Sequence, residues 1–189
     1  ATEAIDRLRT TGESHHRVMV AEVMGRNAGW IALHAGMAAG AHAILIPERQ
    51  VSMDQIAEWV TDAHKRGRAP LVVVAEGFVP EGADAPHSER GLDAFGRPRL
   101  GGIADQLAPE IEARTGFETR ATVLGHIQRG GVPSAFDRVL STRLGMAAAD
   151  AAAAGAWGAM VALRGTDIVR TPLAEALGRL KTVPAARYD

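Results

Sequence analysis

The chain has 189 residues and a formal net charge of −1, with 47% hydrophobic and 23% charged residues. This is the profile of a globular protein, and its balanced charge gives no overall attraction to nucleic acid or to an anionic membrane. Because the chain contains no cysteine, disulfides, thiolate metal sites and cysteine nucleophiles are excluded. We see no signal peptide and no long apolar run, so we expect a cytoplasmic protein without nucleic-acid or membrane partners.

Helical and strand-like segments alternate along the chain, and two helices carry start signals. Ser52 with Gln55, and Ser134 with Asp137, have the spacing of residues that satisfy the free N–H groups of a first helical turn. In chain order we expect a helix to about Glu13, a strand over Arg17–Met24, a helix near Ala28–Ala39, a strand over Ala43–Ile46, a helix after Ser52, a strand over Leu71–Ala75, a loop over Gly77–Gly102, a helix over Ile103–Arg114, a strand over Arg120–Leu124, a helix from Ser134 to Ala154, a strand near Met160–Leu163 and a helix that begins at Thr171-Pro172.

This alternation predicts an α/β fold, a layered and mostly parallel sheet flanked by helices. The first residues, from Ala1 onward, look like the middle of a helix without a start signal, which predicts that the chain is a fragment. A processed or trimmed short protein is the alternative. The seven histidines show no metal-ligand spacing, so we expect no metal site within this chain.

Polar residues follow three of the predicted strands, at the ends where ligands bind in open α/β sheets. Met24-Gly25-Arg26 leads into a helix whose N–H groups and dipole favour an anion, and Arg26 adds a guanidinium. Gly25 lets a ligand approach the backbone. An isolated Met-Gly-Arg is most simply a surface arginine beside a turn glycine, so the prediction depends on the other two strand ends.

Glu76 follows the second of these strands, and the turn that contains His126, Ile127, Gln128 and Arg129 follows the third. His126 and Arg129 can contact the same phosphate as Arg26, while Glu76 can accept hydrogen bonds from hydroxyls. Taken alone, a turn histidine or a glutamate after a strand is usually structural. Together, two cations, an imidazole and a carboxylate fit a phosphorylated polyol.

Two further arginines, Arg17 and Arg120, stand at the beginnings of their strands. At ~3.3 Å per residue, Arg17 lies roughly 23 Å from Met24, and Arg120 roughly 20 Å from His126. One subunit cannot easily bring both groups to one ligand. We therefore expect them either to complete the site of a neighbouring subunit or to be plain strand-edge arginines.

Three segments resemble the 6-phosphofructokinase family closely: Glu22-Val23-Met24-Gly25-Arg26, Ala121 through Gly131, and Ala135-Phe136-Asp137-Arg138. The likeness extends over nearly the whole chain, which is similar to the carboxy-terminal part of such an enzyme. The long segment after Glu76 resembles the bacterial branch that includes pyrophosphate-dependent members.

The resemblance implies a fructose 6-phosphate site. Arg26 would also stabilise the transferring phosphoryl group, and is the implied catalytic residue. Arg17 and Arg120 match the arginines that the family donates across a subunit interface. The implied substrate-binding residues are Arg17, Met24, Gly25, Arg26, Glu76, Arg120, His126, Ile127, Gln128 and Arg129.

The resemblance also implies the organisation of the chain. Residues 1–127, completed by 179–189, would form the sugar-phosphate-binding domain, and residues 128–178 a remnant of the nucleotide-binding domain. The family's nucleotide loop, magnesium aspartate and Thr-Ile-Asp catalytic segment are not in this chain, so the chain alone is expected to be inactive. Where allosteric members carry a glutamate, this sequence has His42, so control by a nucleotide effector is not expected.

For the intact protein, the implied reaction is phosphorylation of the 1-hydroxyl of fructose 6-phosphate in glycolysis by a homo-oligomer, a dimer or tetramer with shared sites. The expected donor is ATP, with pyrophosphate as the alternative, and the cofactor is Mg²⁺, whose ligands lie outside this chain. A second class of function is a non-catalytic sugar-phosphate-binding module, which would keep the strand-end residues and lack the catalytic base.

Overall fold

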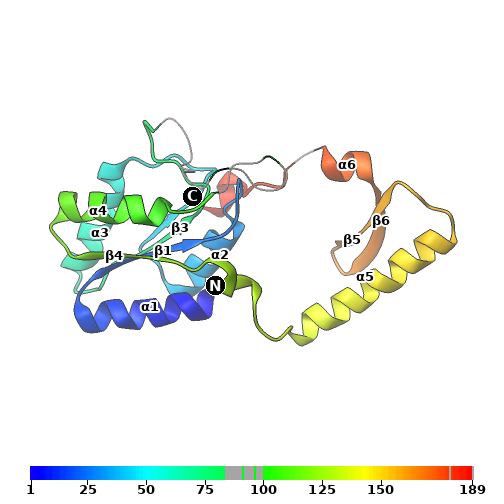
Figure 1. The fold of residues 1–189 in the computed structure, drawn as a ribbon, viewed down its shortest axis with the longest axis horizontal. Coiled ribbons are helices and arrows are strands. Elements are labelled where there is room, and N and C mark those ends of the chain that lie inside the picture. The colour runs from blue at the N-terminus through cyan, green and yellow to red at the C-terminus, as the bar shows by residue number, and fades with distance from the viewer. Residues whose placement is uncertain (84–90, 92–95, 97–99, 179, 189) are drawn as a thin grey trace. The chain divides into compact units, whose positions relative to one another are not determined.

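A computed structural model of the chain describes residues 1–83, 91, 96, 100–178 and 180–188. The chain divides into two compact units, unit 1 (residues 1–129 and 182–189) and unit 2 (residues 130–181). Figure 1 shows the elements of both units. The division falls close to the predicted domain boundaries at 127 and 179, while the roles predicted for the two parts remain predictions.

Unit 1 is built on a four-stranded sheet in which every neighbouring pair is parallel, in the order β2-β3-β1-β4. The expectation of a mostly parallel sheet is confirmed. Every residue of β1 and β3 is buried, as expected when both faces of a parallel sheet are covered. The strands are β1 (Val18–Val23), β2 (Ala43–Leu45), β3 (Leu71–Ala75) and β4 (Thr119–Val123).

Four helices cover the two faces of this sheet (Figure 1). Alternate residues of β1 separate into two apolar cores: Val18 and Val20 pack with α3 and α4, while Met19 and Ala21 pack with α1 and α2. This alternation follows from the two-residue period of a strand. The helices are α1 (Thr2–His15), α2 (Trp30–Ala39), α3 (Met53–Lys65) and α4 (Ile103–Thr115).

The C-terminal tail belongs to unit 1 and is anchored by two neighbouring residues that follow β2. The Glu48 carboxylate accepts hydrogen bonds from the N–H groups of Gly29, at 3.0 Å, and Val183, at 2.8 Å. The Arg49 guanidinium donates to the carbonyl oxygen of Tyr188 at 3.1 Å. The short 3-10 helix η2 (Ala185–Arg187) therefore completes the same unit as α1.

Unit 2 contains a long helix and an antiparallel hairpin, α5 (Ala135–Ala153), β5 (Ala159–Arg164) and β6 (Asp167–Pro172), followed by α6 (Leu173–Leu177). The helix predicted from Thr171-Pro172 is α6, which begins one residue later with Pro172 as its N-cap. The strand β6, which Thr171 and Pro172 end, was not predicted. The strand predicted near Met160–Leu163 is β5, and β6 pairs with it. Gly165, with a φ of 62°, allows the two-residue reversal between the strands.

The helix start signals are confirmed with one difference. The Ser134 hydroxyl accepts from the Asp137 N–H and the Asp137 carboxylate accepts from the Ser134 N–H, which is a complete capping box. At α3, Ser52 caps the Gln55 N–H at 3.2 Å, but the Gln55 side chain donates to Glu58 instead of returning to the cap. Among the described helices, none has both the length and the apolarity needed to cross a membrane.

Candidate functional site

The loop after β1 is held by the carboxylate that follows β3. The Glu76 Oε1 atom accepts hydrogen bonds from the N–H groups of Gly25, at 3.2 Å, and Arg26, at 3.0 Å. Arg26 has a φ of 49°, a left-handed conformation that is uncommon for a residue with a side chain. Because β1 and β3 are neighbours in the sheet, Glu76 lies beside the loop after β1. Its carboxylate holds Arg26 in this conformation.

The turn after β4 reaches the same end of the sheet. It is the short 3-10 helix η1 (Gly125–Arg129), and Gln128 connects it to β1. The Gln128 Oε1 atom accepts from the Met24 N–H at 3.2 Å, while its Nε2 donates to the Gly125 carbonyl at 3.0 Å. Residues more than one hundred positions apart are therefore in direct contact.

The structure thus joins Met24, Gly25, Arg26, Glu76 and Gln128 through hydrogen bonds at the carboxyl ends of β1, β3 and β4. His126, Ile127 and Arg129 are carried on η1 with Gln128, and their side chains are exposed to solvent. Ile127, at 70% exposure, is a large apolar group left uncovered. Two guanidinium groups and an imidazole on these loops are suited to an anionic ligand.

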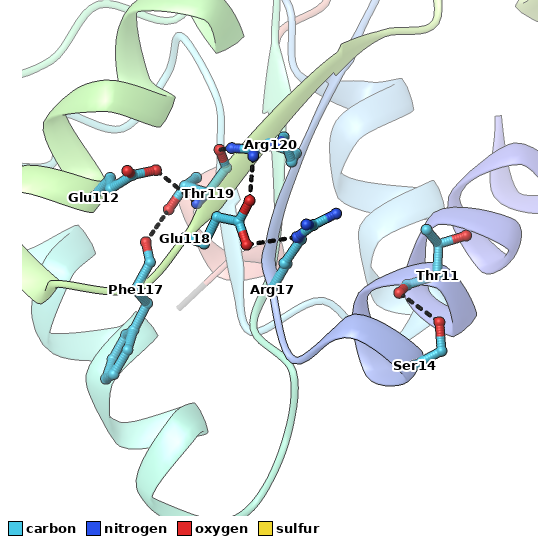
Figure 2. A network of polar contacts seen from close by, with 8 residues as sticks. All are labelled: Thr11, Ser14, Arg17, Glu112, Phe117, Glu118, Thr119 and Arg120. Carbon is cyan, nitrogen blue, oxygen red and sulfur yellow. Dashed lines mark hydrogen bonds and ion pairs between the residues drawn. The ribbon is translucent and has the colours of Figure 1, made fainter.

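Arg17 and Arg120 lie at the opposite, amino end of the same sheet. Arg17 directly precedes β1, and Arg120 pairs with Met19 across the parallel β1–β4 ladder. Figure 2 shows that both guanidinium groups turn toward Glu118. Arg17 Nε donates to Glu118 Oε2 at 2.7 Å, and Arg120 Nη2 donates to Glu118 Oε1. The two arginines therefore share Glu118 as a partner and lie away from the loop that contains Arg26.

The sequence did not single out Glu118. Hydrogen bonding to Arg17, followed by the charge of Arg120, holds the pKa of its carboxyl below the usual value. The available signal was its position two residues before Arg120, where the alternation of a strand places both side chains on one face. That spacing indicates a pair only when the two residues are already known to lie in a strand.

A second missed residue is Glu22, a buried glutamate in the middle of β1. Its carboxylate accepts from the N–H groups of Gly102 and Ala104, at 2.9 to 3.0 Å, and so caps the start of α4. Burial raises the pKa of Glu22, and hydrogen bonds from Ala104 and Gly102 oppose this. A single acidic residue in an otherwise apolar strand was the available signal.

A further basic group surrounds His42, which directly precedes β2. Burial, followed by the charges of Arg68, Arg66 and Arg9, lowers the pKa of His42. Its Nδ1 atom accepts from the Leu71 N–H at 3.1 Å, which fixes the ring beside β3. This imidazole is therefore a neutral, structurally bonded group.

Within the part of the chain that the structure describes, no three His, Asp or Glu side chains come together to hold a metal ion. The described residues therefore offer no fit for Mg²⁺.

Comparisons with known proteins agree with the fold. Residues 1–152 match the family model described as "Phosphofructokinase". The whole chain is 62% identical to the pyrophosphate–fructose 6-phosphate 1-phosphotransferase of Amycolatopsis methanolica, and 56% identical to the ATP-dependent 6-phosphofructokinase of Mycobacterium bovis. It spans about 55% of the length of each of these curated relatives.

The structure of phosphofructokinase from Saccharomyces cerevisiae superimposes with a TM-score of 0.76 at 35% sequence identity, over 94% of this chain and 22% of that chain. A parallel sheet with helices on both faces defines an α/β protein. The chain belongs to the phosphofructokinase family.

Proposed function

We propose that the complete product of the gene that carries this sequence is a 6-phosphofructokinase. It transfers a phosphoryl group to the 1-hydroxyl of fructose 6-phosphate in glycolysis, in the cytoplasm. The observation that carries the proposal is the junction at Glu76, whose carboxylate gathers the Gly25 and Arg26 N–H groups while Gln128 gathers Met24. Three strand ends are thereby locked into one surface in a chain of the phosphofructokinase family.

Each side chain in the proposal has a task that its chemistry supports. Glu76 and the Met24–Arg26 loop bind the sugar, while His126 and Arg129, with the intervening Ile127 and Gln128, bind the 6-phosphate. Arg26 neutralises charge on the transferring phosphoryl group, because phosphoryl transfer is catalysed mainly by positioning and charge stabilisation. Unit 1 provides these residues and is the sugar-phosphate domain, with unit 2 as part of the nucleotide-binding domain.

Arg17 and Arg120 complete the proposed site of a neighbouring subunit. Their position at the amino end of the sheet, away from the loops of their own subunit, supports this sharing. The active protein is then a homo-oligomer, a dimer or a tetramer. Mg²⁺ accompanies the donor and is bound by groups other than the described residues.

The donor in the proposal is ATP. Pyrophosphate is kept as the alternative, since relatives named for either donor resemble the chain over its whole length. The test is an assay of fructose 1,6-bisphosphate formation by the complete gene product with Mg²⁺ and either donor. We expect turnover with one donor and none from residues 1–189 alone. If neither donor gives product while fructose 6-phosphate still binds, the enzyme proposal is wrong and the non-catalytic sugar-phosphate-binding module is favoured.

A further inference from the structure

The amino end of β1 and β4 contains a carboxylate placed between two arginines (Figure 2). Each oxygen of Glu118 takes one of them: Oε2 accepts from Arg17 Nε at 2.7 Å, and Oε1 accepts from Arg120 Nη2. All three side chains are 35 to 52% exposed. Without the carboxylate, two like charges on long, flexible side chains would stand side by side in solvent.

The backbone that carries Glu118 is held on both sides. Its carbonyl oxygen accepts from the Val18 N–H at 2.9 Å, immediately before β4 begins. On one side, the Phe117 ring stacks on His64 with 3.9 Å between ring centroids. On the other, the buried Thr119 donates its N–H to Glu112 at 2.9 Å and its hydroxyl to the Phe117 carbonyl at 2.9 Å. The backbone of Glu118 is therefore held in place, and its carboxylate holds the two arginines.

The way in which Arg17 is bonded to Glu118 leaves guanidinium N–H groups that can bind a ligand. Arg17 uses its Nε, so its two terminal nitrogens have no partner among the residues that the structure describes. An arginine held through Nε presents its terminal nitrogens in a fixed direction, the geometry with which arginine binds phosphate oxygens. Arg120 is held from two sides, since its Nη1 also donates to the Thr119 carbonyl at 3.1 Å.

We propose that Glu118 is a positioning residue, which holds Arg17 and Arg120 together in the orientation in which they receive the sugar phosphate bound by a second copy of this chain. The proposal rests on the proposed function and deepens it, because it assigns to Glu118 a part in the neighbouring subunit's site and none in its own. Glu118 itself touches no substrate. A plain surface ion pair is the competing interpretation, and such pairs contribute little.

The first experiment compares Glu118→Gln with the wild-type complete gene product. The amide keeps the shape but loses the charge and the ability to accept from both arginines. We expect the KM for fructose 6-phosphate to rise about tenfold, which corresponds to the lower end of the contribution of a charge-assisted hydrogen bond, with kcat within about twofold. Glu118→Ala should change KM in the same direction.

The matched control is Glu110→Gln, since Glu110 forms a similarly exposed pair with Arg114 at 3.4 Å on α4. Its KM should equal that of the wild type. Thermal unfolding of each variant establishes that the protein is folded. An unchanged or lowered KM in both Glu118 variants contradicts the proposal.

The second experiment tests action across the interface. In mixed oligomers of Glu118→Gln and Arg129→Ala subunits, the site of the first subunit keeps its own Arg129 and receives intact Arg17, Glu118 and Arg120 from the second. Such sites should work with the wild-type KM, although each variant alone has a raised KM. A raised KM throughout verified mixed oligomers would show that Glu118 acts within its own subunit, and would contradict the proposal.

These outcomes are distinct from a failure of the proposed function itself. If the wild-type complete gene product does not phosphorylate fructose 6-phosphate, both the function and the role of Glu118 fall. If it does so and both Glu118 variants have a normal or lowered KM, the proposed role of Glu118 is wrong and the proposed function stands.

Discussion

The backbone of Arg26 packs directly against Gly77. A Cβ added to Gly77 would lie 1.9 Å from the Arg26 carbonyl oxygen and 2.9 Å from its carbonyl carbon. Arg26 itself occupies a left-handed conformation, which costs roughly 1–2 kcal/mol for a residue with a Cβ. Its position therefore depends on the absence of a side chain at 77 and on the two hydrogen bonds to Glu76.

Gly77→Ala should displace the Arg26 loop, because backbone atoms cannot yield as a flexible side chain can. We expect a destabilisation of about 1–3 kcal/mol and a fall of at least roughly tenfold in kcat/KM, measured by urea unfolding and by the phosphorylation assay. The control is Gly67→Ala, just after α3, where an added Cβ meets nothing within 4 Å but the φ of 73° is unfavourable for alanine. That substitution should cost roughly 1–2 kcal/mol of stability and leave kcat/KM unchanged. Normal activity in Gly77→Ala would show that Arg26 has no catalytic part.

Arg129 tests the phosphate assignment most directly, since its side chain is exposed on η1. Arg129→Ala removes a charge-assisted contact of about 1.5–3 kcal/mol. This corresponds to an increase of about 10- to 150-fold in the KM for fructose 6-phosphate, measured in the complete gene product. Arg7→Ala, which removes an exposed arginine paired with Glu3 on α1, is the control. An equal KM in both variants would show that Arg129 does not bind the phosphate.

At the scale of elements, what the sequence predicted and what it missed have different physical origins. Apolar runs with both faces covered made β1 and β3 recognisable, and the serine caps marked α3 and α5. The strand β6 was missed because its short run ends in Thr171-Pro172, which is also a common helix start. Pro172 is tolerated there because it is the last residue of a two-stranded hairpin.

The site residues follow the same division. The residues that follow the strands were singled out from the combination of polar groups at three strand ends, and their roles remain predictions. Glu22 was missed because its partners are 80 and 82 positions away. Glu118 bonds Arg17 across 101 positions, and its nearby partner Arg120 indicates a pair only once both residues are known to share a strand face. A carboxylate with a distant partner resembles a solvated one until the sheet brings the two together.

The helix α4 depends on the buried Glu22, which predicts an unusual dependence of stability on pH. Burial raises the pKa of Glu22 above the model-peptide value of 4.5, so the folded state binds a proton that the unfolded state releases. The free energy of unfolding contributed by this group is fully present below about pH 4.5 and is lost as pH rises through the folded-state pKa.

Glu22→Gln removes this titration while keeping one oxygen that can accept from α4. The difference in unfolding free energy, wild type minus Glu22→Gln, should therefore decrease as pH rises from about 4.5. Urea unfolding of both proteins across this range measures it. A difference that increases with pH would mean that the hydrogen bonds to the carboxylate outweigh its burial.

For the whole molecule, the two units differ in how much they bury. Unit 1 contains two apolar cores, whereas in unit 2 the one described residue that is buried is Ala151. Large apolar side chains of unit 2 are uncovered, Trp157 at 79% and Phe136 at 66% among them. Exposed apolar surface on this scale is typical of a face that another part of a protein covers.

This contrast predicts different opening free energies within one chain. In residues 1–189 alone, hydrogen exchange at amides of α5 should be on the order of a hundredfold less protected than at amides of β1 and β3, since burial and not helix propensity supplies most helix stability. In the complete gene product, α5 should gain protection while β1 and β3, the internal control, change little. Equal protection of both units in the chain alone would mean that unit 2 is stable without any covering surface, and would remove the argument that its apolar face belongs to an interface.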